Sequence, residues 1–128
     1  MDFVAIDMKK ASDTGAFLHL RHPSTGKLLY SDGEPVGVHV RGKESPAVQS
    51  RVKSAQRRRV TNDSDEDFGL GYLVSLVIGF ENIERDGKPL EPTDESIRWF
   101  FGRSDAFGEQ VLAFSQDRAN FFAGGSTS

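Results

Sequence analysis

The sequence lacks several features on which whole classes of function depend. None of its 128 residues is cysteine, which excludes a disulfide framework, a thiolate nucleophile and a zinc site built on sulfur. Its longest apolar run, Tyr72 to Phe80, is about half as long as a membrane-spanning helix requires. No apolar segment near the N-terminus is typical of a signal peptide. We therefore expect a soluble intracellular protein with no membrane partner.

An excess of positive charge is also missing. The chain carries 16 lysines and arginines against 19 aspartates and glutamates, which gives a formal net charge of −3. General nucleic-acid binders and proteins of anionic membranes usually carry a net positive surface. The charge balance argues against both classes. The length fits one domain that folds around its own core.

Motifs for bond-making chemistry are absent from the sequence. Gly69-Leu70-Gly71 lacks the third glycine and the downstream acidic residue of a dinucleotide site, and there is no phosphate-binding loop. There is no Gly-x-Ser-x-Gly elbow either. The carboxylates of the acidic run from Asn62 to Asp67 would repel one another on an exposed loop instead of converging in a dry catalytic cleft. The run suits the start of a helix, where the helix dipole favours negative charge, and binding of a cation or of a basic partner is the alternative. We expect neither an enzyme nor a cofactor.

The three histidines are the groups that titrate nearest to neutral pH. His19 and His22 have an H-x-x-H spacing, and His39 falls on a neighbouring predicted strand, so a three-imidazole metal site is geometrically conceivable. In an alternating strand, however, residues 19 and 22 point to opposite faces, and His22 precedes a proline in a turn. Ordinary surface histidines are the favoured interpretation, and we expect no metal.

The first third of the chain carries strand patterns. Residues 1–15 are predicted to form an N-terminal arm. Within residues 16–41, alternating side chains and two turn clusters, at 22–26 and 31–35, predict three short antiparallel strands. Valines at every second position from Val36 place one apolar face on the last of these strands.

The rest of the chain carries helix patterns. Caps and spacing predict helices over about 45–60, 67–80, 94–101 and 104–122. The second is apolar nearly all round, which indicates central burial, and a strand remains the alternative because short apolar runs are ambiguous. The predicted fold class is therefore α+β. It is a single domain over residues 16–122, in which an N-terminal hairpin or three-strand meander precedes a four-helix bundle and a flexible tail over 123–128.

Aromatic residues are concentrated near the C-terminus, with seven of the ten phenylalanines and the only tryptophan between Phe80 and Phe122. Neighbours on a helix diverge by about 100°, so adjacent rings cannot all face the core. We expect surplus rings to contact a partner. The residues predicted to bind are Trp99, Phe101, Phe121 and Phe122, and those predicted to be core are Phe80, Phe107, Val111 and Phe114.

A basic run, Arg57-Arg58-Arg59, lies at the end of the first predicted helix. Contact with nucleic-acid phosphates is one interpretation, although the run lacks interleaved aromatic residues and the adjacent acidic run screens it. A solvated or internally paired helix face is another. An acidic protein partner is the third, and it adds Arg57 and Arg58 to the candidate binding residues.

The order of these elements resembles the tail assembly chaperones of long-tailed bacteriophages. The resemblance rests on LHLRHPSTGKLL, on LVSLVIGFENIERDGKPLEPTDESIRWFF and on the ending EQVLAFSQDRANFF, and it covers roughly residues 16–122. It implies a protein that binds the tape-measure protein, helps to recruit tail-tube subunits around it and acts in the host cytoplasm during assembly.

Other functions remain open from the sequence. A structural virion component, of the head-tail connector or tail-terminator type, would share this size and composition. A small nucleic-acid-binding regulator that uses the arginine run is a third class. Self-association into a homo-oligomer is compatible with each of them.

Overall fold

Alternating valines build the centre of a three-stranded antiparallel sheet. In β4 (Gly37–Val40), Val38 and Val40 are fully buried while His39 between them is half-exposed, as the two-residue period of a strand requires. Strand β4 lies between β1 (Ala16–His19) and β5 (Val77–Glu81) and pairs with both.

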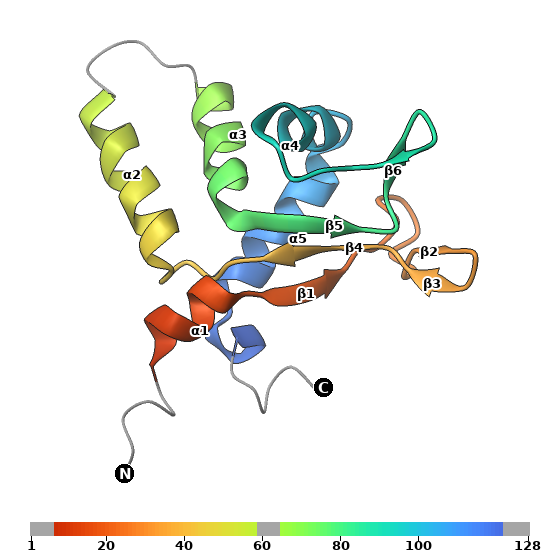
Figure 1. Ribbon diagram of the computed structural model, residues 1–128, viewed down its shortest axis with the longest axis horizontal. Coiled ribbons are helices and arrows are strands. Elements are labelled where there is room, and N and C mark those ends of the chain that lie inside the picture. Colours follow the sequence, from red (N-terminus) through yellow and green to blue (C-terminus); the bar gives the residue numbers. More distant parts are fainter. Residues whose placement is uncertain (1–6, 59–64, 122–128) are drawn as a thin grey trace.

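The computed structural model describes residues 7–58 and 65–121, with backbone only for 54–58 and 65–68. The fold class is α+β, as predicted from the sequence (Figure 1). Helices α3 (Asp65–Leu76), α4 (Asp94–Phe101) and α5 (Asp105–Gln116) contribute to one core with the buried valines of β4. These helices therefore cover a single face of the sheet.

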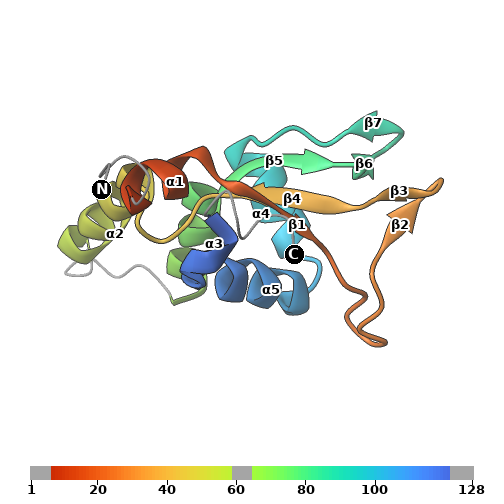
Figure 2. The same cartoon turned by 90° about the horizontal axis from the view of Figure 1, so that it is seen from below.

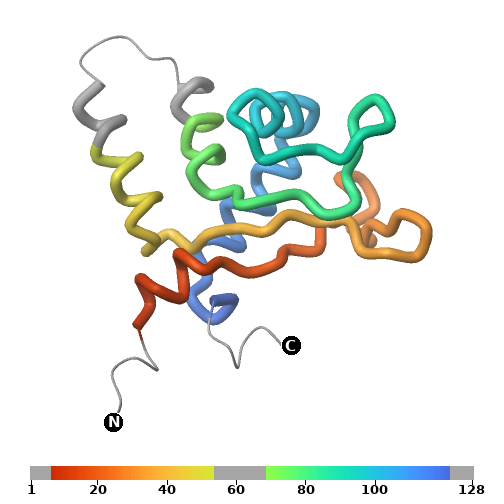
Figure 3. Tube along the Cα trace, in the orientation of Figure 1, coloured from red at the N-terminus to blue at the C-terminus, as the bar shows by residue number. Residues whose placement is uncertain are grey.

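The remaining helical elements are α1 (Met8–Thr14), α2 (Pro46–Arg58) and the 3-10 turn η3 (Arg118–Phe121). Helix α2 packs beside α3. Helix α1 lies against both α2 and η3, as the trace in Figure 3 shows for α1 and η3. The segments at the two ends of the described chain thus meet.

Two hairpins extend from the sheet. One joins β2 (Tyr30–Ser31) to β3 (Glu34–Pro35), and the other joins β6 (Glu84–Arg85) to β7 (Lys88–Pro89). Both turns are two residues long, with Asp-Gly at the centre and positive φ at both positions. This is the conformation that matches the twist of a hairpin, and Asp-Gly is among the pairs that adopt it most readily.

The prediction of a helix over 67–80 is wrong for its last four residues. Helix α3 ends at Leu76, and Val77 starts β5. The β-branched pair Val77-Ile78 and the following glycine disfavour helix, and β4 offers a strand edge that the segment can pair with. The strand alternative therefore holds for this part of the run.

Other boundaries also differ from the predictions. The expected N-terminal arm contains α1, capped by the Asp7 side chain. Strand β1 pairs directly with β4, so residues 20–36 leave the sheet and return, in place of a continuous meander. Strand β5 and the β6–β7 hairpin stand between the second and third of the four predicted helices.

The last predicted helix, 104–122, is divided in the structure. Helix α5 starts after Ser104, as expected, but it ends at Gln116. Asp117 adopts an extended conformation, and η3 then turns the chain back. The break allows Phe121 to lie edge-on against Phe114, with ring centroids 5.5 Å apart.

A cluster of four phenylalanines joins the sheet to two helices. Phe100 of α4 lies at its centre, 5.3 Å from Phe80 of β5, 5.0 Å from Phe101 and 5.3 Å from Phe107 of α5, measured between ring centroids. Edge-on and stacked pairs in this distance range are favourable beyond the area they bury. The cluster fixes the position of α4 against the sheet.

Replacing Phe100 by alanine removes the ring shared by these contacts. We expect Phe100→Ala to lower the free energy of unfolding by about 3–5 kcal/mol, the usual cost of a large-to-small change at a buried aromatic. Urea unfolding followed by circular dichroism measures it. Tyr30→Ala is the matched control, because that ring is 60% exposed, and equal losses for the two variants would contradict the central role of the cluster.

Candidate functional site

The side chains able to bind a metal ion lie apart from one another in the described part of the chain. Among the side chains that the structure describes, no three histidines or carboxylates gather closely enough to hold a metal ion. Burial raises the pKa of the Tyr72 phenol, so this hydroxyl stays protonated at neutral pH and supplies no base there.

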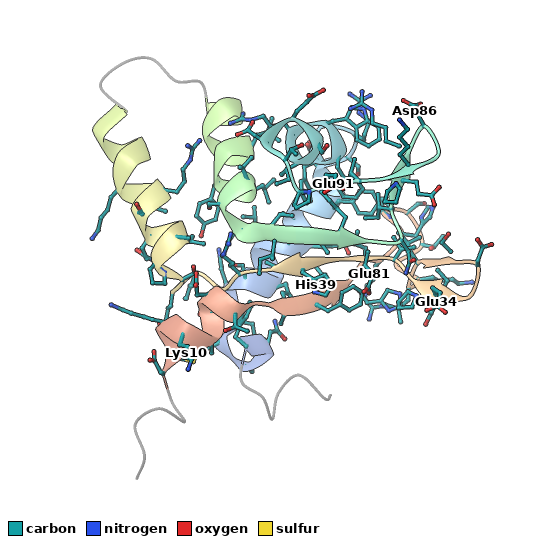
Figure 4. The ribbon with its side chains drawn as sticks, viewed as in Figure 1. Lys10, Glu34, His39, Glu81, Asp86 and Glu91 are labelled. Carbon is teal, nitrogen blue, oxygen red and sulfur yellow. The ribbon has the colours of Figure 1, made fainter. Side chains whose placement is uncertain are left out.

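Each histidine is engaged separately. His19 places Nε2 2.6 Å from the carbonyl of Leu29. His22 accepts hydrogen bonds at Nδ1 from the backbone of Ser24 and Thr25, which closes its turn. His39 lies 3.7 Å from a carboxylate oxygen of Glu81, and both residues are labelled in Figure 4. The three rings do not converge on one site.

Two of the aromatic residues expected at a binding surface belong to the interior. Phe101 is 2% exposed and Phe121 is 7% exposed, so the prediction that they remain outside the core is wrong. In α4, Ile97, Phe100 and Phe101 occupy positions i, i+3 and i+4, which form one helix face, and all three are buried. Phe121 is buried because the break at Asp117 folds η3 back onto α1 and α5.

The other predictions have mixed outcomes. Val111 is fully buried, as expected, and Phe80, Phe107 and Phe114 are partly buried against the core. Phe122 lies outside the described residues. Arg57 and Arg58 belong to α2, but their side chains are likewise outside the part that the structure describes.

Trp99 is the surplus ring of α4. Its side chain is partly exposed, and part of it packs against the core. The guanidinium carbon of Arg85 in β6 lies 4.4 Å from the centroid of the Trp99 ring. That of Arg103, just beyond α4, lies 5.8 Å from it. Both distances fall within the range of cation–π attraction.

A third positive charge belongs to the same neighbourhood. Lys88 is the cross-strand partner of Arg85 in the two-residue hairpin, so the two side chains share one face of the ribbon. We call Trp99, Arg85, Lys88 and Arg103 together the Trp99 patch. Figure 2 shows the β6–β7 ribbon that carries two of these residues beyond β5.

The charges of the Trp99 patch have no carboxylate partner within 4 Å among the described side chains. The ion pairs among the described side chains involve Arg41, Arg98 and Arg118, and His39 lies near Glu81. Three cations that no described carboxylate pairs with within 4 Å thus lie close to an aromatic ring, in a chain whose net charge is negative.

Sequence reasoning found Trp99 but missed its three cationic neighbours. An Asp-Gly pair such as Asp86-Gly87 is typical of a two-residue hairpin, which places the flanking Arg85 and Lys88 opposite each other. Nothing in the local pattern, however, indicated that this hairpin folds against α4. That contact is tertiary, and it depends on Leu90, which is buried and whose N–H donates to the carbonyl of Ile83.

The face of the sheet opposite the core carries a second group of rings. Phe17 lies 5.2 Å from His39, and His19 lies 4.9 Å from Tyr30, between ring centroids. Gly37 lies beneath Phe17, where a Cβ would collide with the ring. We call this group the open-face strip, and His39 and Glu81 lie at its border.

Comparisons with protein-family models, with curated proteins and with solved structures find no match to this chain. Within the described ranges, no helix combines the length and the apolar character that crossing a membrane would need. The surface of the protein itself must therefore indicate its role.

The geometry of the Trp99 patch predicts a spectroscopic signature. Arg85→Ala uncovers part of the ring, so we expect the fluorescence of Trp99, the only tryptophan, to shift to longer wavelength. Loss of an exposed cation–π contact should cost about 0.5–1 kcal/mol of stability. Arg98→Ala is the control, because Arg98 pairs with Asp94 at 2.6 Å and does not cover the ring. Identical spectra for both variants would contradict the contact.

Proposed function

We propose that this protein is a non-enzymatic tail assembly chaperone of a long-tailed bacteriophage, which binds the tape-measure protein and helps to recruit tail-tube subunits. The observation that carries the proposal is the Trp99 patch, a partly exposed tryptophan flanked by arginines that no carboxylate of the described residues pairs with. The resemblance of residues 16–122 to that family supports it independently.

The composition of the patch supports a role in protein recognition. Tryptophan and arginine are the residues most enriched at positions that dominate binding energy. Trp99 stands on a helix whose neighbouring residues, Phe100 and Phe101, are anchored in the core. A ring held in this way loses little conformational freedom when a partner binds, which favours affinity.

The proposal also fits the small size of the domain and its charged surface. A chaperone for a long helical protein needs a stable small domain, a charged exterior and a limited contact surface. Partner helices commonly dock by their apolar face with a few anchor residues. The proposal includes the order of elements on which the resemblance rests, which is hairpin, basic helix, apolar segment, Asp-Gly turn and closing amphipathic helix. It also includes action of the protein in the host cytoplasm.

Co-expression with the tape-measure protein of the same genome tests the function. We expect the chain to keep that protein soluble and to co-purify with it. Trp99→Ala should lower the recovered complex roughly tenfold or more, since loss of a dominant contact costs about 2 kcal/mol or more. Because Trp99 also touches the core, the folded state of the variant is checked by circular dichroism.

The matched control is Tyr30→Ala, an exposed ring of the open-face strip, which should leave co-purification unchanged. Two outcomes contradict the proposal. One is a tape-measure protein that aggregates equally with and without the chain. The other is recovery of the chain in fixed stoichiometry from purified phage particles, which indicates a structural virion component.

A further inference from the structure

We propose that the Trp99 patch recognises an acidic α-helix, with an apolar side chain of that helix on Trp99 and its carboxylates on Arg85, Lys88 and Arg103. The inference rests on the proposed function for the identity of the partner, the tape-measure protein. Its chemistry rests on the patch alone.

Stacking on a ring leaves an arginine free to bind an anion. A guanidinium group is planar, and its N–H donors lie in that plane. Arg85 holds its guanidinium carbon over the Trp99 ring, 4.4 Å from the centroid, and its side chain is exposed, so the N–H donors that face away from the ring are open to a partner. They then form two parallel hydrogen bonds with a carboxylate. The ring also holds the guanidinium in place before the partner arrives.

The charges of the patch select the sign of the partner. Arg85, Lys88 and Arg103 are all exposed, and the described carboxylates leave them unpaired. A partner with aspartates or glutamates at this contact gains attraction and a faster encounter, while a basic partner is repelled. Charge complementarity therefore indicates an acidic occupant.

The extent of the positive charge favours discrete carboxylates over a nucleic acid. Glu84, Asp86 and Glu91 flank Arg85 and Lys88 along the chain and are exposed, and Asp86 at the hairpin tip is labelled in Figure 4. A nucleic acid needs a positive track that follows several successive phosphates. Here the positive region is interrupted after three side chains.

The arrangement of the patch fits one face of a helix. Arg85 and Arg103 lie against a single ring although they come from β6 and from the end of α4. Carboxylates spaced three or four residues apart on a helix are neighbours on its surface. Acids separated by one turn can therefore reach both arginines while an apolar residue between them covers Trp99.

Trp99 is the only tryptophan, so its fluorescence reports binding at the patch directly. The probes are three synthetic helical peptides of equal length that share leucines on one face and carry glutamate, glutamine or lysine on the other. None contains tryptophan. We expect the glutamate peptide to change the Trp99 emission and to bind roughly tenfold or more tightly than the others. Its affinity should fall as salt is raised.

Charge reversal sharpens the test. Arg103→Glu should abolish binding of the glutamate peptide and favour the lysine peptide. Lys27→Glu changes the net charge equally at an exposed turn outside the patch and should change nothing. Equal affinity for all three peptides, or equal effects of both variants, overturns the inference. So does stronger binding of a single-stranded oligothymidylate than of the glutamate peptide.

The inference and the proposed function fail separately. Full-length tape-measure protein that co-purifies with Arg103→Glu as well as with the unchanged chain overturns the inference and leaves the proposed function intact. A glutamate peptide that binds at Trp99, together with a tape-measure protein that never co-purifies, supports the inference and overturns the proposed function.

Discussion

Three consecutive aromatic residues on one short helix, Trp99-Phe100-Phe101, set the constraint on which this structure depends. Successive side chains of a helix point about 100° apart, so a single core cannot take all three. Phe100 and Phe101 enter the core, where Phe100 contacts rings from β5 and α5. Trp99 remains at the surface. The interactions that stabilise the domain therefore also hold its partly exposed ring in position.

The charged neighbours of Trp99 depend on a second constraint, the β6–β7 hairpin. Its Asp86-Gly87 turn has positive φ at both residues, which brings the flanking cations together on one face of the ribbon. Leu90, just after the β6–β7 hairpin, is buried in the core and so holds that end of the hairpin against it. Arg85 thereby reaches the ring of Trp99, fourteen positions later in the chain. Local turn chemistry and one buried leucine are sufficient to place the charge.

Local signals were predictable from the sequence, and tertiary consequences were not. The predicted bounds of α4 follow from propensity and capping, and the structure has the helix where expected, with Thr93 as its cap. Both Asp-Gly pairs have the sequence that favours a two-residue hairpin, and both adopt that turn. Strand β5 was only the alternative to a helix, because its apolar residues suit either element and the free edge of β4 decides between them. Phe101 and Phe121 were assigned to the surface because no local pattern shows which of two adjacent rings turns inward, nor that the chain breaks at Asp117.

The central claim is that the Trp99 patch, and not the open-face strip, contacts the partner. Site-specific photo-cross-linking during tail assembly tests it most directly, with benzoylphenylalanine introduced at position 99 in one protein and at position 39 in another. The account predicts a covalent adduct with the tape-measure protein from position 99 and none from position 39. An adduct from position 39 alone would contradict it.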